Sequence, residues 1–310
     1  MASKEITLHV LPRGRPIKSL PTEICLPRAS NGSELYEHLA KTAKTSVHRI
    51  RVTKGSDGSL VPNKSGVLIA DTGLLGDSKI YVKDLGLQIG WRTVFIIEYM
   101  GPIFIHPLIY LLRPYLYRNP NSSSFPAPSP LQQLSLLLIC LHFVKRELET
   151  LFVHRFSLAT MPVRNIFKNS FHYWVLAGAN IAYWVYSPAA PIQNTWEPLL
   201  VYLGLALFTF GELANANAHL VLRGLRSSGG KERGIPKGFG FGLVTCPNYM
   251  FETAAWIGMI LVTRSLATVL FAAVSVGQMA VWAPKKERAL RKDFGDKYKR
   301  KRYTMLPGIW

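Results

Sequence analysis

The sequence predicts a small α+β unit followed by an all-α polytopic membrane bundle of about six transmembrane helices. Composition changes sharply near residue 90: the earlier part is polar and mixed, whereas 91–283 is dominated by Leu, Ile, Val, Phe, Trp and Ala. The apolar segments approach the roughly 20 residues that a membrane span needs. Lys and Arg gather in alternate loops, as the positive-inside rule describes. We therefore expect a cytosolic domain at 1–85 and a membrane-embedded domain at 86–310.

The first domain is expected to contain four strands and one helix. Apolar and polar residues alternate, as in half-buried strands, at Ile6–Val10, Thr22–Leu26, His48–Thr53 and Lys79–Val82. The helix would begin after Ser30, Asn31 or Ser33, each a suitable N-cap. It would end near Thr45. The order β-β-α-β-β resembles the ubiquitin-like β-grasp, and we expect an adaptor or folding role for it.

The membrane domain is expected to cross the bilayer six times. The apolar segments lie near 91–112, 131–153, 167–187, 196–222, 249–264 and 265–283. With the N-terminus in the cytosol, the basic segments 154–166, 223–248 and 284–310 all face the same side. An even number of spans returns the C-terminus to the cytosol, where ten Lys and Arg residues of the tail meet anionic lipid.

Charge and residue spacing exclude several classes of function. The formal net charge is +19, but the cations cluster beside apolar segments, which favours membrane lipid over nucleic acid as the partner. The three cysteines are far apart and form neither a disulfide framework nor a zinc motif. The eight histidines form no clusters typical of di-iron enzymes, so no metal is expected.

Three apolar segments carry polar groups that lipid should reject, namely Glu98, the pair Lys145 and Arg146, and Tyr249. Ionisable groups inside membrane segments are costly and indicate function by default. In the expected topology all lie near the cytosolic side, where a reaction site could form. Structural alternatives remain: Glu98 could pair with a distant cation, Lys145 with Glu149 four residues on, and Tyr249 could be an interfacial aromatic.

Further polar residues point to an anion-binding cavity. Glu212, Asn215 and His219 recur at helical spacing in the fourth span, and Arg223 and Arg226 continue close to that stripe. The following loop contains Arg233, which could meet phosphates. The fifth span opens with Asn248, a plausible N-cap, and Glu252. Gly238–Gly242 alternates Gly and Phe but lacks the βαβ context of a dinucleotide loop.

Longer strings give a family resemblance. They are KDLGLQIGWR (83–92), EYMGP (98–102), KRELETLFVHRFSLATMP (145–162), FKNSFHYWVL (167–176) and CPNYMFE (246–252). With them the chain resembles the steroid 5α-reductase family of polytopic NADPH-dependent reductases, most closely its very-long-chain trans-2-enoyl-CoA reductases of the endoplasmic reticulum. The resemblance covers essentially the whole chain, since those reductases also begin with a ubiquitin-like domain.

The resemblance implies the last, reductive step of very-long-chain fatty-acid elongation, with NADPH as cofactor and a long-chain trans-2-enoyl-CoA as substrate. It implies a multi-pass protein of the endoplasmic reticulum that works beside an elongase, a ketoacyl-CoA reductase and a dehydratase. Tyr249, Glu98 and Lys145 match positions that matter for catalysis. The cofactor-binding candidates are Arg146, Asn215, His219, Arg223, Arg226, Arg233, Asn248 and Glu252. His219 stands where the steroid enzymes have an aspartate.

Two other hypotheses stay open. The first is another reductase of the same fold that acts on a steroid or a polyprenol. The second is a non-enzymatic, ubiquitin-like membrane adaptor that recruits cytosolic partners. The polar stripe of the fourth span speaks against an adaptor, because a simple anchor has no use for such groups in lipid.

Overall fold

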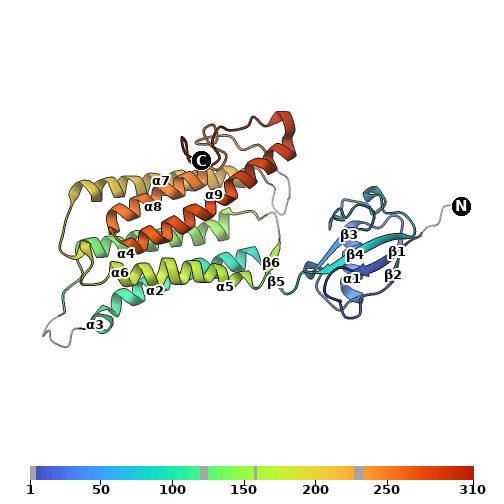
Figure 1. Cartoon of the computed structure of the whole chain (residues 1–310), viewed down its shortest axis with the longest axis horizontal. Helices are drawn as coiled ribbons and strands as arrows, with labels where there is room; N and C mark the ends of the chain where they lie inside the picture. Colours follow the sequence, from blue (N-terminus) through green and yellow to red (C-terminus); the bar gives the residue numbers. More distant parts are fainter. Residues whose placement is uncertain (1–4, 119–124, 157–158, 227–233) are drawn as a thin grey trace. The chain divides into compact units, whose positions relative to one another are not determined.

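The computed structural model describes residues 5–118, 125–156, 159–226 and 234–310. These residues form two compact units. The first contains residues 5–91 and 159–165, and the second contains the rest of the described chain (Figure 1). A short segment from the middle of the sequence therefore joins the N-terminal unit, which local sequence patterns did not predict.

The first unit is built on a mixed four-stranded sheet. Its strands are β1 (Glu5–Pro12), β2 (Glu23–Pro27), β3 (Ile50–Lys54) and β4 (Ser78–Asp84). Their order is β2-β1-β4-β3, with β1 parallel to β4 and the other two pairs antiparallel. The four predicted strands are thus confirmed. Two short 3-10 helices, Val47–Arg49 and Ala70–Thr72, precede and follow β3.

One helix, α1 (Gly32–Thr42), packs its apolar side against this sheet. Asn31 is the N-cap among the three candidates: its side chain accepts from the backbone N–H of Glu34 at 3.1 Å, and the Glu34 carboxylate accepts from the N–H of Asn31 at 3.3 Å. This reciprocal capping box satisfies two backbone donors at the helix start. The helix ends before the predicted Thr45, because Lys44 adopts a left-handed φ of 49°.

The first unit also contains a small two-stranded sheet of β5 (Gln88–Gly90) and β6 (Thr160–Pro162), which are antiparallel. The indole of Trp91 donates a hydrogen bond of 3.1 Å to the carbonyl oxygen of Thr160. The end of the 83–92 string therefore holds a distant chain segment.

The second unit is helical, and its helices lie roughly side by side in Figure 1. They are α2 (Trp91–Leu111), α3 (Arg113–Leu116), α4 (Pro130–Leu148) with the π-helical η3 (Glu149–Val153), α5 (Asn165–Ser170) with the π-helical η4 (Phe171–Asn180) and α6 (Ile181–Val185), α7 (Pro198–Gly224), α8 (Pro247–Thr263) and α9 (Leu266–Phe294). Short 3-10 turns occur at Pro191–Gln193 and Gly295–Lys297. Helical structure therefore occupies each of the six predicted segments.

Three of the described helical segments are long and apolar enough to cross a membrane: Trp91–Leu111, Pro198–Gly224 and Leu266–Lys297. Many large apolar side chains on this unit point outward, among them Phe104, Leu111, Leu199, Leu213 and Leu266. A water-soluble surface would not carry so much exposed apolar area, whereas lipid accepts it. The protein is an integral membrane protein.

Glycines bring α7 and α8 into close contact. A Cβ on Gly211 would lie 2.5 Å from the backbone N of Ala255, and a Cβ on Gly258 would lie 2.5 Å from the carbonyl oxygen of Gly204. Small residues permit such close backbone approach between membrane helices. The polar stripe of α7 is thereby held directly against the first turns of α8.

The last helix is longer than predicted. The sequence analysis ended the span at 283, before Pro284, but α9 continues to Phe294 with Pro284 inside it. Proline removes the backbone donor that would reach the carbonyl oxygen four residues earlier, here that of Ala280. The indole N–H of Trp310 donates to this oxygen instead, at 3.0 Å. A contact from the end of the described chain thus replaces the missing helical bond.

The C-terminal segment also supports the start of α8. The backbone N–H groups of Thr245 and Cys246 donate to the carbonyl oxygens of Tyr303 and Thr304. Beside this pairing, the hydroxyl of Tyr298 donates to the Glu287 carboxylate at 2.6 Å. Burial, and then the bond to Glu287, raise the pKa of Tyr298 to about 12, so the phenol stays protonated. These contacts fix the segment that leads into the CPNY motif.

Candidate active site

A cavity of about 450 Å³ lies where the end of α4 and η3, the end of α7, the start of α8 and the middle of α9 meet. Its wall carries five cationic side chains, from Arg146, Arg155, Arg223, Arg226 and Lys286. Aromatic rings, including that of Phe241, complete it. So many cations beside apolar helices form a site for a large, multiply charged anion.

The π-helical turn η3 shapes one side of the cavity. The backbone N–H of His154 donates to the carbonyl oxygen of Glu149 at 2.7 Å, five residues back. A π turn is wider than an α turn and often marks a functional position. Here it turns Glu149 into the bundle, where its side chain is buried.

Behind the cavity lies a buried ionic cluster, which consists of His142, Lys145, Arg146, Glu149, Glu212, Asn215, His219 and Glu252. Lys145 Nζ lies 3.1 Å from Glu212 Oε2 and 3.3 Å from Glu149 Oε1. It also donates to Asn215 Oδ1 at 2.5 Å. The predicted i,i+4 pair of Lys145 with Glu149 is confirmed, and the Glu212 contact adds a second carboxylate. Buried charges need such partners to offset their lost hydration.

Arg146 connects the cluster to the cavity wall. Its Nη1 lies 2.8 Å from Glu149 Oε2, and its Nη2 donates to the Tyr99 hydroxyl at 2.9 Å. The guanidinium also lies over the Tyr99 ring, 5.1 Å from the centroid. A guanidinium that is held on two sides keeps its direction, so Arg146 presents a fixed positive charge to the cavity.

Asn215 and Glu252 join α7 to α8 at the same depth. The Asn215 side chain donates to the backbone oxygen of Asn248 at 2.8 Å and to Glu252 Oε2 at 3.2 Å. Glu252 Oε1 accepts from the Trp256 indole at 3.2 Å and lies 3.4 Å from His142 Nε2. Both residues therefore brace the wall, rather than line the cavity.

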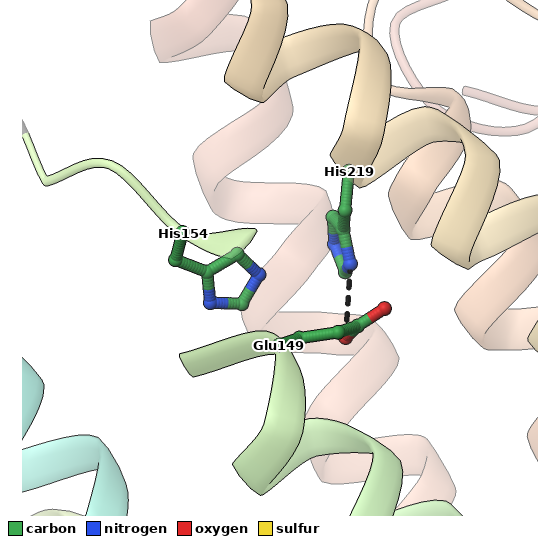
Figure 2. Close-up of side chains that lie close together, drawn as sticks. All are labelled: Glu149, His154 and His219. Atoms are coloured by element: carbon green, nitrogen blue, oxygen red, sulfur yellow. Dashed lines mark ion pairs between the residues drawn. The ribbon is translucent and has the colours of Figure 1, made fainter. Parts of the chain in front are cut away.

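Glu149, His154 and His219 approach one another, with possible ligand atoms within 4.8 Å (Figure 2). His219 Nδ1 lies 3.0 Å from Glu149 Oε2. Glu149 already contacts two cations, Arg146 and Lys145, which would repel a metal ion at this place. Burial, and then the nearby Arg146, lower the pKa of His154 to about 3, so its ring is neutral. We interpret the three residues as a structural contact, in which Glu149 pairs with His219 and the His154 ring packs edge-on against the His219 ring.

Glu98 has no ion-pair partner among the described residues. Its side chain is only 1% exposed, and its Oε2 has no hydrogen-bond partner in the described chain. The pairing with a distant cation that the sequence left open is therefore not found. Nearby, Gly101 of the EYMGP string lets the Trp174 ring lie against α2, since a Cβ there would be 2.1 Å from that ring.

Tyr249 lies on the α8 face that meets α9. Its ring packs beside Met279 and Ala283, and the Lys286 ammonium lies 4.5 Å from the ring centroid. In the described part of the chain, no hydrogen bond or ion pair joins Tyr249 to Glu98 or Lys145. The predicted N-cap role of Asn248 is wrong: Cys246 is the N-cap, because Pro247 already suits the first helical position.

The structure thus groups the predicted residues in different ways. Arg146, His219, Arg223, Arg226 and Asn248 line the cavity, whereas Lys145, Asn215 and Glu252 lie in the cluster behind it. Arg233 lies outside the described residues. Four residues of the cavity and the cluster were not predicted from the sequence as site residues: His142, His154, Arg155 and Lys286. Lys286 could have been noticed, because it follows Met279 by seven residues and so shares its helical face.

The chain is similar in sequence to several known proteins. Residues 159–310 match the family model described as 3-oxo-5-alpha-steroid 4-dehydrogenase. The chain is 41% identical to a very-long-chain enoyl-CoA reductase of Dictyostelium discoideum, over 88% of this chain and 90% of the relative. It is 40% identical to a Schizosaccharomyces pombe protein described as an enoyl reductase, over 95% and 97%. A trans-2,3-enoyl-CoA reductase-like protein of Mus musculus is 33% identical, over 74% and 64%.

Proposed function

This chain belongs to the family of very-long-chain enoyl-CoA reductases, and we propose that it performs the family's reaction with NADPH at the cavity described above. It is an oxidoreductase of very-long-chain fatty-acid elongation. The substrate proposed is a long-chain trans-2-enoyl-CoA, and the product is the saturated acyl-CoA. The single observation that carries the assignment to this cavity is its wall of five cations beside a lipid-facing helical bundle.

The side chains of the cavity fit NADPH. Phosphate groups prefer Arg and Lys donors, and Arg146, Arg223 and Arg226 offer them. Asn248 adds a polar side chain at the start of α8. When bound, NADPH supplies the hydride that C3 of the substrate receives. A further arginine of the wall, Arg155, is available to the phosphates of CoA, which share the same chemistry.

The protein must supply a proton for C2 and stabilise the negative charge that develops on the thioester oxygen. We propose Tyr249 as the donor, because it stands at the start of α8 beside a cation. Lys145 already contacts three oxygens, so it would act through its positive field rather than by a new hydrogen bond. Oε2 of Glu98 has no hydrogen-bond partner among the described residues, so this buried carboxyl group is available for a second catalytic role.

The finer features of the protein are part of the same proposal. The parallel pairing of β1 with β4, the flanking β2 and β3 and the packed helix α1 support a ubiquitin-like β-grasp for the first domain.

Helices in all six predicted segments support six spans in the endoplasmic reticulum membrane. Cations at one end of the bundle support cytosolic N- and C-termini. The proposed partners are the elongase, the ketoacyl-CoA reductase and the dehydratase, which are the other enzymes of the elongation cycle.

A direct assay tests the proposal. Detergent-solubilised protein is expected to oxidise NADPH with a trans-2-enoyl-CoA of about 18 or more carbons. An acyl chain of this length is comparable to the thickness of the bilayer core. Mass spectrometry should find the saturated acyl-CoA as the product. A 3-oxo-4-ene steroid and a polyprenol serve as competing substrates. If either is turned over faster than the enoyl-CoA, the chain is a reductase of the same fold with another substrate. If the enoyl-CoA is not turned over at all, the proposal is refuted.

A further inference from the structure

Lys286 is the cation that contacts the proposed proton donor. Its Nζ lies 4.5 Å from the centroid of the Tyr249 ring, so the ammonium makes a cation–π contact with this ring. Lys286 also lines the cavity, from α9, whereas Tyr249 comes from α8. The pair therefore bridges two helices, and of the two side chains it is Lys286 that lines the cavity.

The charge of Lys286 is not neutralised by a carboxylate. The ion pairs found among the described residues include none with Lys286, in contrast to Lys145 and Arg146, which share Glu149. The neighbouring Glu287 is turned away and is engaged by Tyr298 and Thr245. An ammonium without a carboxylate partner is available to the aromatic ring that it contacts.

The cation–π contact also restricts the phenol. A cation on the face of an aromatic ring is attracted to it, so the ammonium limits the positions that the Tyr249 ring can take. A ring held in this way keeps its hydroxyl group in a defined direction.

We propose that Lys286 is the positioning residue for Tyr249: its ammonium holds the phenol ring in the position from which the hydroxyl group reaches the substrate. This rests on the proposed function of Tyr249. In the balanced step, the C2=C3 bond opens as hydride reaches C3, and the Tyr249 proton forms the new C2–H bond. The phenolate then recovers a proton from water. Lys145, which the sequence offered as the nearby cation, is held instead in the ionic cluster.

The test compares Lys286→Met with Lys286→Arg in the full-length enzyme. Loss of the cation–π contact is expected to lower kcat by roughly tenfold in Lys286→Met. KM for the enoyl-CoA and Kd for NADPH should stay close to the wild-type values. Lys286→Arg, which keeps the positive charge, should recover most of the lost kcat. Lys285→Met is the matched control, because it removes an exposed neighbouring charge and should leave kcat unchanged.

A double-mutant cycle sharpens the result. If Lys286 acts through the phenol, Lys286→Met should add little to the loss already caused by Tyr249→Phe. If the losses in kcat of the two single variants multiply in the double variant, the proposal is overturned. So would a weaker NADPH Kd with unchanged kcat, which would make Lys286 a phosphate ligand. Failure of the wild-type enzyme to reduce an enoyl-CoA is a separate outcome that refutes the proposed function itself.

Discussion

The side-chain amide of Asn215 donates a hydrogen bond of 2.8 Å to the backbone carbonyl oxygen of Asn248. The same side chain accepts from Lys145 at 2.5 Å. One amide therefore connects α4, α7 and the first turn of α8. It holds the start of α8, which carries the proposed catalytic tyrosine, against the buried ionic cluster.

Replacing Asn215 by Ala should destabilise the protein by about 1–3 kcal/mol, because Lys145 and the Asn248 carbonyl would lose a buried partner. The apparent Tm of the detergent-solubilised protein measures this loss. Asn217→Ala is the control, since Asn217 lies two residues further on the same helix and is exposed. Equal Tm values for the two variants would show that the amide does not join the helices.

Tyr249→Phe should lower kcat by about 100-fold or more, the usual scale for losing a general acid. The ring keeps its packing beside Met279 and Ala283, so folding and NADPH affinity should be retained. Turnover of a long trans-2-enoyl-CoA is the measurement. Tyr202→Phe, at an exposed position on α7, provides the control. Near-normal turnover of Tyr249→Phe would remove this phenol from the chemistry.

Arg226→Ala should weaken NADPH binding by about tenfold or more, the loss of one charge-assisted contact to a phosphate. Arg226 lines the cavity and is oriented by a hydrogen bond to the carbonyl oxygen of Arg155. Isothermal titration gives the Kd. Arg288→Ala removes an exposed arginine of α9 and should leave the Kd as it is. An unchanged Kd in Arg226→Ala would assign the guanidinium to another role.

Gly240→Ala should destabilise the segment before α8 by about 2 kcal/mol or more, from the left-handed backbone and the overlap together. Gly240 has a φ of 81°, and a Cβ there would lie 2.6 Å from the Cβ of Pro247. Gly242→Ala is a matched control, because a Cβ on Gly242 meets nothing within 4 Å. Limited proteolysis of this segment and Tm compare the two. If both variants behave alike, the packing against Pro247 is not required.

Trp310→Phe should lower the apparent Tm by the equivalent of about 1 kcal/mol, the value of one net hydrogen bond. The indole N–H of Trp310 donates to the carbonyl oxygen of Ala280, in place of the helical hydrogen bond that Pro284 removes. Trp282→Phe changes an exposed indole on the same helix and is the control. A Tm equal to that of the control would mean that water satisfies the Ala280 carbonyl equally well.

Patterns within one helix or strand were predicted well. The strands of the first unit follow from alternation of apolar residues, and the Lys145–Glu149 pair follows from i,i+4 spacing. The stripe of Glu212, Asn215 and His219 needed only the helical period to be placed on one face. Such patterns depend on local geometry, which three or four neighbouring residues set.

Contacts between helices could be decided only by tertiary packing. The rotation and crossing of α8 and α9 bring Tyr249 to Lys286 and not to Lys145 or Glu98, and the close approach of α7 to α8 depends on glycines from both. Pro284 lies inside α9 because a residue far along the chain donates to Ala280. Residue spacing carries no information about how two helices turn toward each other, since that angle results from the sum of many packing contacts.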